Sequence, residues 1–188
     1  MKIEDSGMPD ESYWNTLFDI ERIVTWLAIP ENAVVAEIGA GYGTFTVPIA
    51  SVSREVVAFD IDPAMVEVTR RNLANSGRSN VKCVVRDVLA EGTGLASESV
   101  DVVVLFNVLH FHERRILLHE ACRLLKAGGV AAIIHFRKDV PTPRGPAVEL
   151  RPDLATILSA AEGLPLDIHG NDKVLEPYHW GIQLLKRH

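Results

Sequence analysis

The 188-residue chain has little of several features that define whole classes of protein. Its two cysteines, Cys83 and Cys122, lie in apolar stretches without CxxC spacing, so neither a disulfide framework nor a zinc site is indicated. No unbroken apolar run is longer than the one from Val102 to Phe106, which is far too short to cross a bilayer. These absences predict a cytoplasmic protein in reducing surroundings, with no membrane partner.

Positive charge is also scarce. The 19 Lys and Arg residues are outnumbered by 25 Asp and Glu residues, which gives a net charge of −6. Phosphate binding needs concentrated Lys and Arg, so we expect no nucleic-acid partner. The chain opens "MKIEDSGMPDES", which is acidic where a targeting segment would be basic and then apolar.

The middle of the chain alternates short apolar runs with segments of helical period, which is typical of an α/β protein with a parallel sheet. We predict strands at 33–38, 55–60, 81–86, 100–106 and 130–136, and helices at 45–52, 63–76 and 113–126. The helix at 113–126 is expected to end at the glycines that follow it. No helix is evident between residues 86 and 99.

The two flanks have patterns of their own. Apolar residues recur at helical spacing from Asp10 to Leu27, which predicts one helix there. After Phe136 come a loop with four prolines, a helix near 153–162 and two strands joined at Pro177 as a hairpin. At this length the chain fits a single domain.

Three glycines follow the first predicted strand, in "AEIGAGYGTFTV". A strand, a glycine-rich turn and a helix together present backbone N–H groups and a helix N-terminus to a ligand. The alternative is a tight turn that binds nothing. A dinucleotide fingerprint, GxGxxG counted from Gly39, would need a glycine where Thr44 stands.

Two acidic residues end the next two strands. Asp60 comes 21 residues after Gly39, where a carboxylate can bond both hydroxyls of a ribose, and Asp87 can accept from an adenine amine. The alternative for each is helix capping or a solvated strand end, and this alternative is preferred for Asp62.

These residues resemble the class I methyltransferases that use S-adenosylmethionine. The segments "VVAEIGAGYGTFT", "VVAFDIDPAMVEVTRRN", "VKCVVRDVL" and "RLLKAGGVAAII" look like four successive motifs of that family, over residues 33–136. The resemblance implies a three-layer αβα Rossmann-like sandwich: a mostly parallel seven-stranded sheet with an antiparallel C-terminal hairpin strand. It implies a cofactor-binding core at 33–136, an N-terminal helical lid at 1–32 and a substrate side at 137–188.

The resemblance also implies roles for residues near the glycine turn. The backbone of Gly39, Ala40, Gly41 and Gly43 would pass beside the methionine and ribose of the cofactor. Glu37 would lie beneath the turn, ordering it or accepting from the methionine ammonium.

The remaining cofactor contacts follow the later strands. Asp60 would hold the ribose, Ile61 and Met65 would pack on an adenine face, and Asp87 with the Val88 N–H would bind the adenine edge. For Met65, core packing is an equal alternative.

The segment "FNVLHFHERR" follows the fourth strand. Asn107 would lie under the sulfonium, and residues 107–110 do not match the (N/D)PPY pattern of enzymes that methylate amino groups of nucleic acids. His110 is the candidate general base, although a structural histidine is an equal alternative. His112 adds an HxH pair without a third ligand, so no metal is expected.

Candidate substrate contacts lie outside the core. Tyr13 and Trp14 are adjacent on a helix and cannot both face the core, so one of them could cap the site. Arg144, between prolines and Gly145, and His179 at the hairpin turn are further candidates, with solvation or turn packing as the alternative.

We expect methyl transfer to a small molecule, because only residues 1–32 precede the sheet and large substrates are usually gripped by added domains. The protein would be a monomer or a homodimer. One alternative is a cofactor-binding regulatory protein without transfer activity. A nicotinamide-dependent oxidoreductase is disfavoured by Thr44, by Asp87 and by the lack of a Tyr-xxx-Lys pair.

Overall fold

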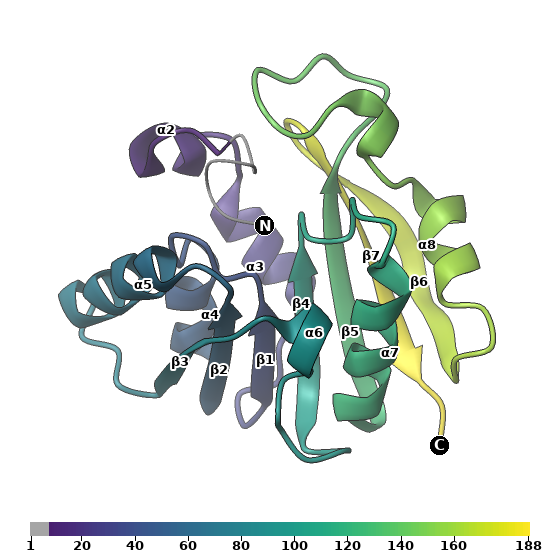
Figure 1. Cartoon of the computed structure of the whole chain (residues 1–188), viewed down its shortest axis with the longest axis horizontal. Helices are drawn as coiled ribbons and strands as arrows, with labels where there is room; N and C mark the ends of the chain where they lie inside the picture. Colours follow the sequence, from purple (N-terminus) through teal and green to yellow (C-terminus); the bar gives the residue numbers. More distant parts are fainter. Residues whose placement is uncertain (1–7) are drawn as a thin grey trace.

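A computed structural model describes residues 8–188 and shows a sheet between two layers of helices (Figure 1). The described part of the chain contains seven strands in the order β3-β2-β1-β4-β5-β7-β6. The strands are β1 (Val34–Ile38), β2 (Glu55–Asp60), β3 (Val81–Val85), β4 (Val100–Phe106), β5 (Leu125–Phe136), β6 (Leu166–Leu175) and β7 (His179–Lys186). Strands β1 to β5 run parallel, and β7 is antiparallel to both β5 and β6. The predicted αβα sandwich and C-terminal hairpin are therefore confirmed.

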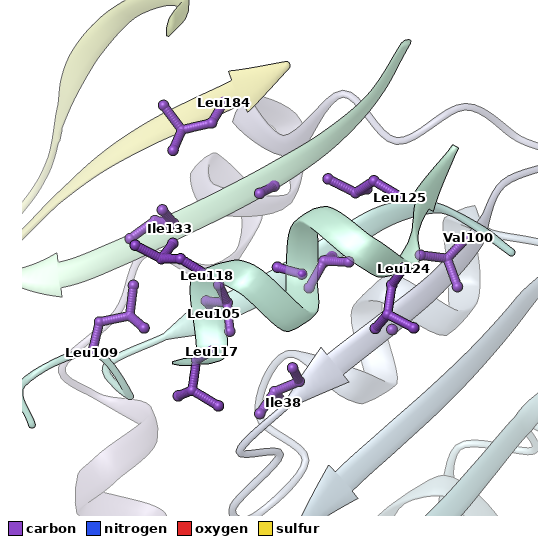
Figure 2. Close-up of a cluster of buried hydrophobic side chains, with 14 of the residues drawn as sticks. Ile38, Val100, Leu105, Leu109, Leu117, Leu118, Leu124, Leu125, Ile133 and Leu184 are labelled. Atoms are coloured by element: carbon purple, nitrogen blue, oxygen red, sulfur yellow. The ribbon is translucent and has the colours of Figure 1, made fainter. Parts of the chain in front are cut away.

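Helices cover both faces of the sheet. They are α2 (Glu11–Asn15), α3 (Ile20–Leu27), α4 (Thr46–Val52), α5 (Pro63–Asn75), α6 (Val88–Glu91), α7 (Arg114–Leu124), the 3₁₀ turn η1 (Val148–Leu150) and α8 (Leu154–Ala160). One buried apolar cluster joins the sheet to α3, α4 and α5, and a second joins it to α6, α7 and α8. Figure 2 shows the second cluster, where Leu117, Leu118 and Leu124 of α7 point at the sheet. Because the inner strands are covered on both faces, they are almost wholly apolar.

The predicted N-terminal helix is broken in two, so the expectation of one helix over 10–27 was wrong. Asp19 begins α3 as its N-cap, accepting from the backbone N–H of Arg22. Phe18, just before it, forms a bridge to Pro177 and is buried. This long-range contact, which helical spacing alone does not predict, turns the chain between α2 and α3.

Two further boundaries differ from expectation. A short helix, α6, lies in the stretch predicted as a loop, because the Asp87 carboxylate accepts from the N–H of Ala90 and caps it. Helix α7 ends at Leu124, before the predicted glycine stop. Leu125 already pairs with Val100, and the register with β4 then shifts before Val130, so the glycines lie in an irregular start of β5.

His179 lies inside the protein at the start of β7. Its ring is stacked against Phe18, 4.4 Å away, and lies 4.2 Å from Phe136, measured between ring centroids. Neither ring nitrogen has a partner among the described residues. Burial, and to a smaller extent the positive charge of Arg151, lower the pKa of His179 to about 3.

Substitution of the core face of α7 is expected to destabilise the fold. Leu118 is fully buried, so Leu118→Ala should lower the free energy of unfolding by about 2–5 kcal/mol. Ile116, on the same helix, is 48% exposed, and Ile116→Ala serves as the control, with an expected loss below about 1 kcal/mol. Urea denaturation measures both, and equal losses would contradict the packing described.

The buried His179 should make stability depend on pH. Since its folded pKa lies below the unfolded value of about 6.5, the unfolded chain binds the proton first and stability falls as the pH drops below about 6.5. We expect His179→Phe to reduce the loss of unfolding free energy between pH 7 and pH 5 by about 2 kcal/mol. Urea denaturation at the two pH values measures this difference. An unchanged loss would show that His179 does not titrate with unfolding.

Candidate functional site

A cavity of about 200 Å³ opens at the carboxyl ends of the parallel strands. One part of its wall, the β1–β3 half, consists of Ile38, Gly39, Ala40, Gly41, Thr44, Phe45, Phe59, Asp60, Ile61, Asp62, Met65, Arg86, Asp87, Val88 and Leu89. The other part, the β4–β5 half, consists of Phe106, Asn107, Val108, His110, Phe111, Leu117, Phe136, Gly145 and Pro146. Met8 and Trp14 of the N-terminal segment complete the wall.

The glycine turn after β1 forms one edge of the cavity. Gly39 and Gly41 have φ values of +82° and +55°, which residues with a side chain rarely adopt. A Cβ on Gly39 would collide with the side chain of Val108, so glycine at this position also lets the turn pack against the residues after β4. Glycine is therefore needed at position 39 for close packing against Val108, in addition to any contact that the turn makes within the cavity.

Asp60 fixes this turn to the end of β2. Its Oδ2 accepts from the N–H of Gly41 at 2.7 Å, and its Oδ1 accepts from the N–H of Asp62 at 2.9 Å. Burial raises the pKa of Asp60, against the opposing effect of these hydrogen bonds. A carboxylate has about four acceptor sites, so Asp60 can still accept from a ligand in the cavity.

Glu37 and Gly43 lie behind the cavity wall and do not line it. Glu37 is buried in β1, and its Oε2 accepts from the hydroxyl of Thr46 at 2.6 Å. Burial raises the pKa of Glu37 to about 8, so the carboxyl holds a proton at neutral pH. Its contact is with the first residue of α4, which supports an ordering role rather than contact with a ligand.

Asp87 and Val88 line the cavity at the end of β3. The Asp87 carboxylate caps α6 through the N–H of Ala90 at 3.1 Å, which is the capping alternative, and its role toward a ligand stays a prediction. The neighbouring Arg86, which the sequence did not single out, also lines the cavity, and its Nε donates to the carbonyl of Gly92.

Asn107 follows β4 with a φ of +56°, a left-handed conformation that asparagine tolerates better than most residues. Both polar atoms of its amide are buried, and neither has a partner among the described residues. Buried polar groups are nearly always hydrogen-bonded, so the free donor and acceptor of this amide make Asn107 a candidate for contact with a ligand.

His110 lines the same half of the cavity, with its ring centroid 4.1 Å from that of Phe111. Its Nδ1 is buried without a partner among the described residues. Burial lowers the pKa of His110, and the positive charge of Arg114 lowers it further. A hydrogen bond to the Asn107 backbone acts in the opposite direction and raises the pKa. His110 is therefore neutral at neutral pH and able to accept a proton.

His135 of β5, which sequence reasoning missed, holds the loop that carries Asn107 and His110. Its Nε2 accepts from the N–H of Leu109 at 3.1 Å, so the ring is neutral and its proton is on Nδ1. Burial lowers the pKa of His135 well below its usual value. The His135 and His110 ring centroids are 6.5 Å apart.

Of the predicted substrate contacts, Trp14 lines the cavity, whereas Tyr13, Arg144 and His179 do not. Tyr13 is 38% exposed, as expected for one of two adjacent aromatic residues on a helix.

The loop after β5 reaches the cavity through Gly145 and Pro146 instead of Arg144. The buried Arg151 fixes this loop, donating to the carbonyls of Pro146 and Arg137 and to the hydroxyl of Thr142.

The N-terminal segment is tied across the glycine turn. The Tyr42 hydroxyl donates to the carbonyl of Pro9 at 2.8 Å, and the Thr44 hydroxyl donates to Oδ1 of Asn15 at 2.7 Å. Glu11 accepts from side chains of α5, which Figure 1 shows next to α2. Met8 lies 3.4 Å from the position that a Cβ on Gly41 would take.

Residues 8–188 contain neither a cluster of metal ligands nor a helix that could span a membrane. No group of three or more His, Cys, Asp or Glu side chains is placed to hold a metal ion. No helix in this range is long and apolar enough to cross a membrane.

The sequence is similar to those of several methyltransferases. It is 31% identical over 126 residues to an uncharacterized methyltransferase-like protein of Schizosaccharomyces pombe, covering 64% of this chain and 46% of that protein. It is 33% identical over 150 residues to a demethylmenaquinone methyltransferase of Clavibacter sepedonicus, covering 74% of this chain and 57% of that protein. The chain thus spans about half the length of the curated relatives it matches.

Relatives with other substrates match over shorter stretches. A probable ribosomal RNA small subunit methyltransferase A of Methanosphaera stadtmanae is 33% identical over 61 residues, which are 32% of this chain and 22% of that protein.

Solved structures share the fold. The crystal structure of a SAM-dependent methyltransferase from Aquifex aeolicus superposes with a TM-score of 0.80 at 22% identity, covering 94% of this chain and 93% of that one. A family model described as "Methyltransferase domain" matches residues 35–129, about half of the chain, from β1 to the start of β5. The chain belongs to the class I S-adenosylmethionine-dependent methyltransferase family.

Proposed function

We propose that the protein transfers a methyl group from S-adenosylmethionine to a small molecule. One observation carries the proposal: the free amide of Asn107 lies in the same cavity wall as the glycine turn and the carboxylates of Asp60 and Asp87. Such a wall offers acceptors for the ribose and adenine of the cofactor and an unpaired polar group beside them.

The residues of the β1–β3 half fit the cofactor. The backbone of Gly39, Ala40 and Gly41 would pass beside its methionine and ribose, and Asp60 would accept from the ribose hydroxyls. Glu37 and Gly43 would act from behind this wall, by ordering the glycine turn.

The adenine would lie further along the same wall. Ile61 and Met65 would pack on its face, and Asp87 with the N–H of Val88 would bind its edge. Ile61 is 37% exposed, an apolar surface that a bound ring would cover.

Methyl transfer requires few catalytic groups from the protein. S-adenosylmethionine, when bound, supplies a methyl carbon on a positively charged sulfur, so much of the catalysis can come from positioning the acceptor in line. Asn107 would position groups beside the transferred methyl group. Neutral His110 would take the proton from a methyl acceptor whose reacting atom carries one.

The contacts at the N-terminus support a lid. Residues 8–15 cover the glycine turn through a few hydrogen bonds at their edges, and the Trp14 ring lies against that of Phe136, with centroids 6.3 Å apart. We propose that this segment opens for exchange of cofactor and product.

A small acceptor is favoured over ribosomal RNA. The lining residues include a single Lys or Arg side chain, Arg86, at the β3 end. A cofactor-binding regulatory protein would show the same cavity, and acceptor-dependent release of S-adenosylhomocysteine distinguishes the two.

Calorimetric titration tests the cofactor. We expect binding of S-adenosylmethionine and S-adenosylhomocysteine but not of NAD, and we expect Asp60→Ala to weaken binding by about 1–3 kcal/mol, because hydrogen bonds to a charged acceptor are lost. Asp167→Ala, at an exposed carboxylate on β6, is the control and should leave the affinity unchanged. Binding of NAD alone would overturn the proposal. Equal affinities of the two variants would remove Asp60 from the site.

A further inference from the structure

We propose that the acceptor is an uncharged, largely apolar ring compound with a hydroxyl group, and that Asn107 and His110 hold this hydroxyl in the β4–β5 half of the cavity. The inference rests on the methyl transfer proposed above and adds the chemical class of the acceptor and the atom that is methylated, an oxygen.

Charge is distributed unevenly over the cavity wall. Its charged side chains are Asp60, Asp62, Arg86 and Asp87, and all four belong to the β1–β3 half. The residues that line the β4–β5 half include no Lys, Arg, Asp or Glu. A carboxylate, phosphate or ammonium group bound there would lose its hydration without gaining an oppositely charged partner, which is costly. The acceptor group bound in this half is therefore uncharged.

Guanidinium groups lie near this half without lining the cavity. Arg114 donates from Nε to the carbonyl of Leu109 at 3.0 Å. Arg151 makes hydrogen bonds within its own loop and lies over the Phe136 ring, with its guanidinium carbon 5.6 Å from the ring centroid. Neither residue lines the cavity, so neither supplies the missing charge.

The wall of this half is aromatic. Phe136 meets Trp14 of the N-terminal segment at an interplanar angle of 67°, and Phe111 and Pro146 add two more apolar rings. Aromatic side chains favour ring compounds through stacked and edge-to-face contacts. This shape and composition suit a flat apolar ring better than a flexible polar chain.

The polar groups of this half match a hydroxyl. Asn107 has a free donor and a free acceptor, and His110 has an unpartnered buried Nδ1. A hydroxyl can donate and accept at once, so it can pair with both side chains. When it reacts, its proton passes to the neutral His110 ring and its oxygen bonds the methyl carbon. The electron pair of the broken carbon–sulfur bond stays on sulfur.

Matched probes test the class without requiring turnover. The full chain, saturated with S-adenosylhomocysteine, is titrated with 4-ethylphenol, 4-ethylbenzoate and 4-ethylbenzylamine, and dissociation constants are measured by NMR. We expect 4-ethylphenol to bind at least tenfold more tightly than either charged probe. Tighter binding of a charged probe, or no binding of 4-ethylphenol up to its solubility limit, overturns the inference while the proposed methyl transfer stands. Failure of S-adenosylhomocysteine itself to bind would overturn the proposed function.

A charge placed in the wall should change this preference. Phe111→Arg adds a cation to the β4–β5 half, and we expect it to shift the ratio of affinities at least tenfold toward 4-ethylbenzoate. Ile116→Arg adds the same charge to the exposed face of α7 and should leave the ratio unchanged. A similar shift in both variants would mean that the probes bind elsewhere.

The role of the hydroxyl is measured against ethylbenzene. Wild-type protein should bind 4-ethylphenol at least fivefold more tightly than ethylbenzene, and His110→Leu should reduce this preference to less than half. A variant with reduced affinity for both probes but the same ratio would indicate that His110 acts only on packing.

Discussion

Burial of the inner strands on both faces is the constraint on which the rest of this structure depends. A strand covered by helices on each side has no place for a polar side chain along its length, so polar groups are confined to the ends. In a parallel sheet these ends meet at one edge, and there Asp60, Asp87 and Asn107 line one cavity. The apolar core and the polar site therefore follow from the same arrangement.

Glu37 is an exception, because it is a polar side chain buried within an inner strand. Its carboxyl is buried within β1 and responds by holding a proton at neutral pH, since burial raises its pKa to about 8. A protonated carboxyl can still bond the Thr46 hydroxyl at the first residue of α4. The buried acid thus connects the strand to the helix on either side of the glycine turn, without an uncompensated charge in the core.

Sequence periodicity predicted the fold well because its signals are local. The glycine turn and the acids at strand ends could be placed from runs of apolar residues, and Gly39, Gly41, Asp60 and Asp87 do lie together at the cavity. Two of the three misses, the break in the N-terminal helix and the early end of α7, come from contacts between residues far apart in the chain. Pairing of Phe18 with Pro177 breaks the N-terminal helix, and no periodicity encodes it.

The same limit applies to the site. Phe136 and Pro146 reach the cavity because Arg151 folds their loop back, and His135 supports Leu109 from a neighbouring strand. None of these has a motif. Each becomes visible only when hydrogen-bond partners and distances are known, because its role is defined by a neighbour rather than by its own spacing.

The family match covers the two halves of the cavity to different extents: the β1–β3 half lies wholly within it, and the β4–β5 half lies partly outside it. The family match covers β1 to the start of β5 and ends before Phe136 and Pro146. The residues that would meet the acceptor come in part from this unmatched region and from the N-terminal segment, where Trp14 lies against Phe136. The β1–β3 half carries the charged side chains, and the β4–β5 half carries aromatic rings and two neutral polar side chains. If the acceptor binds in the β4–β5 half as proposed, selectivity would come from excluding charged groups, since this wall offers them no partner to replace water.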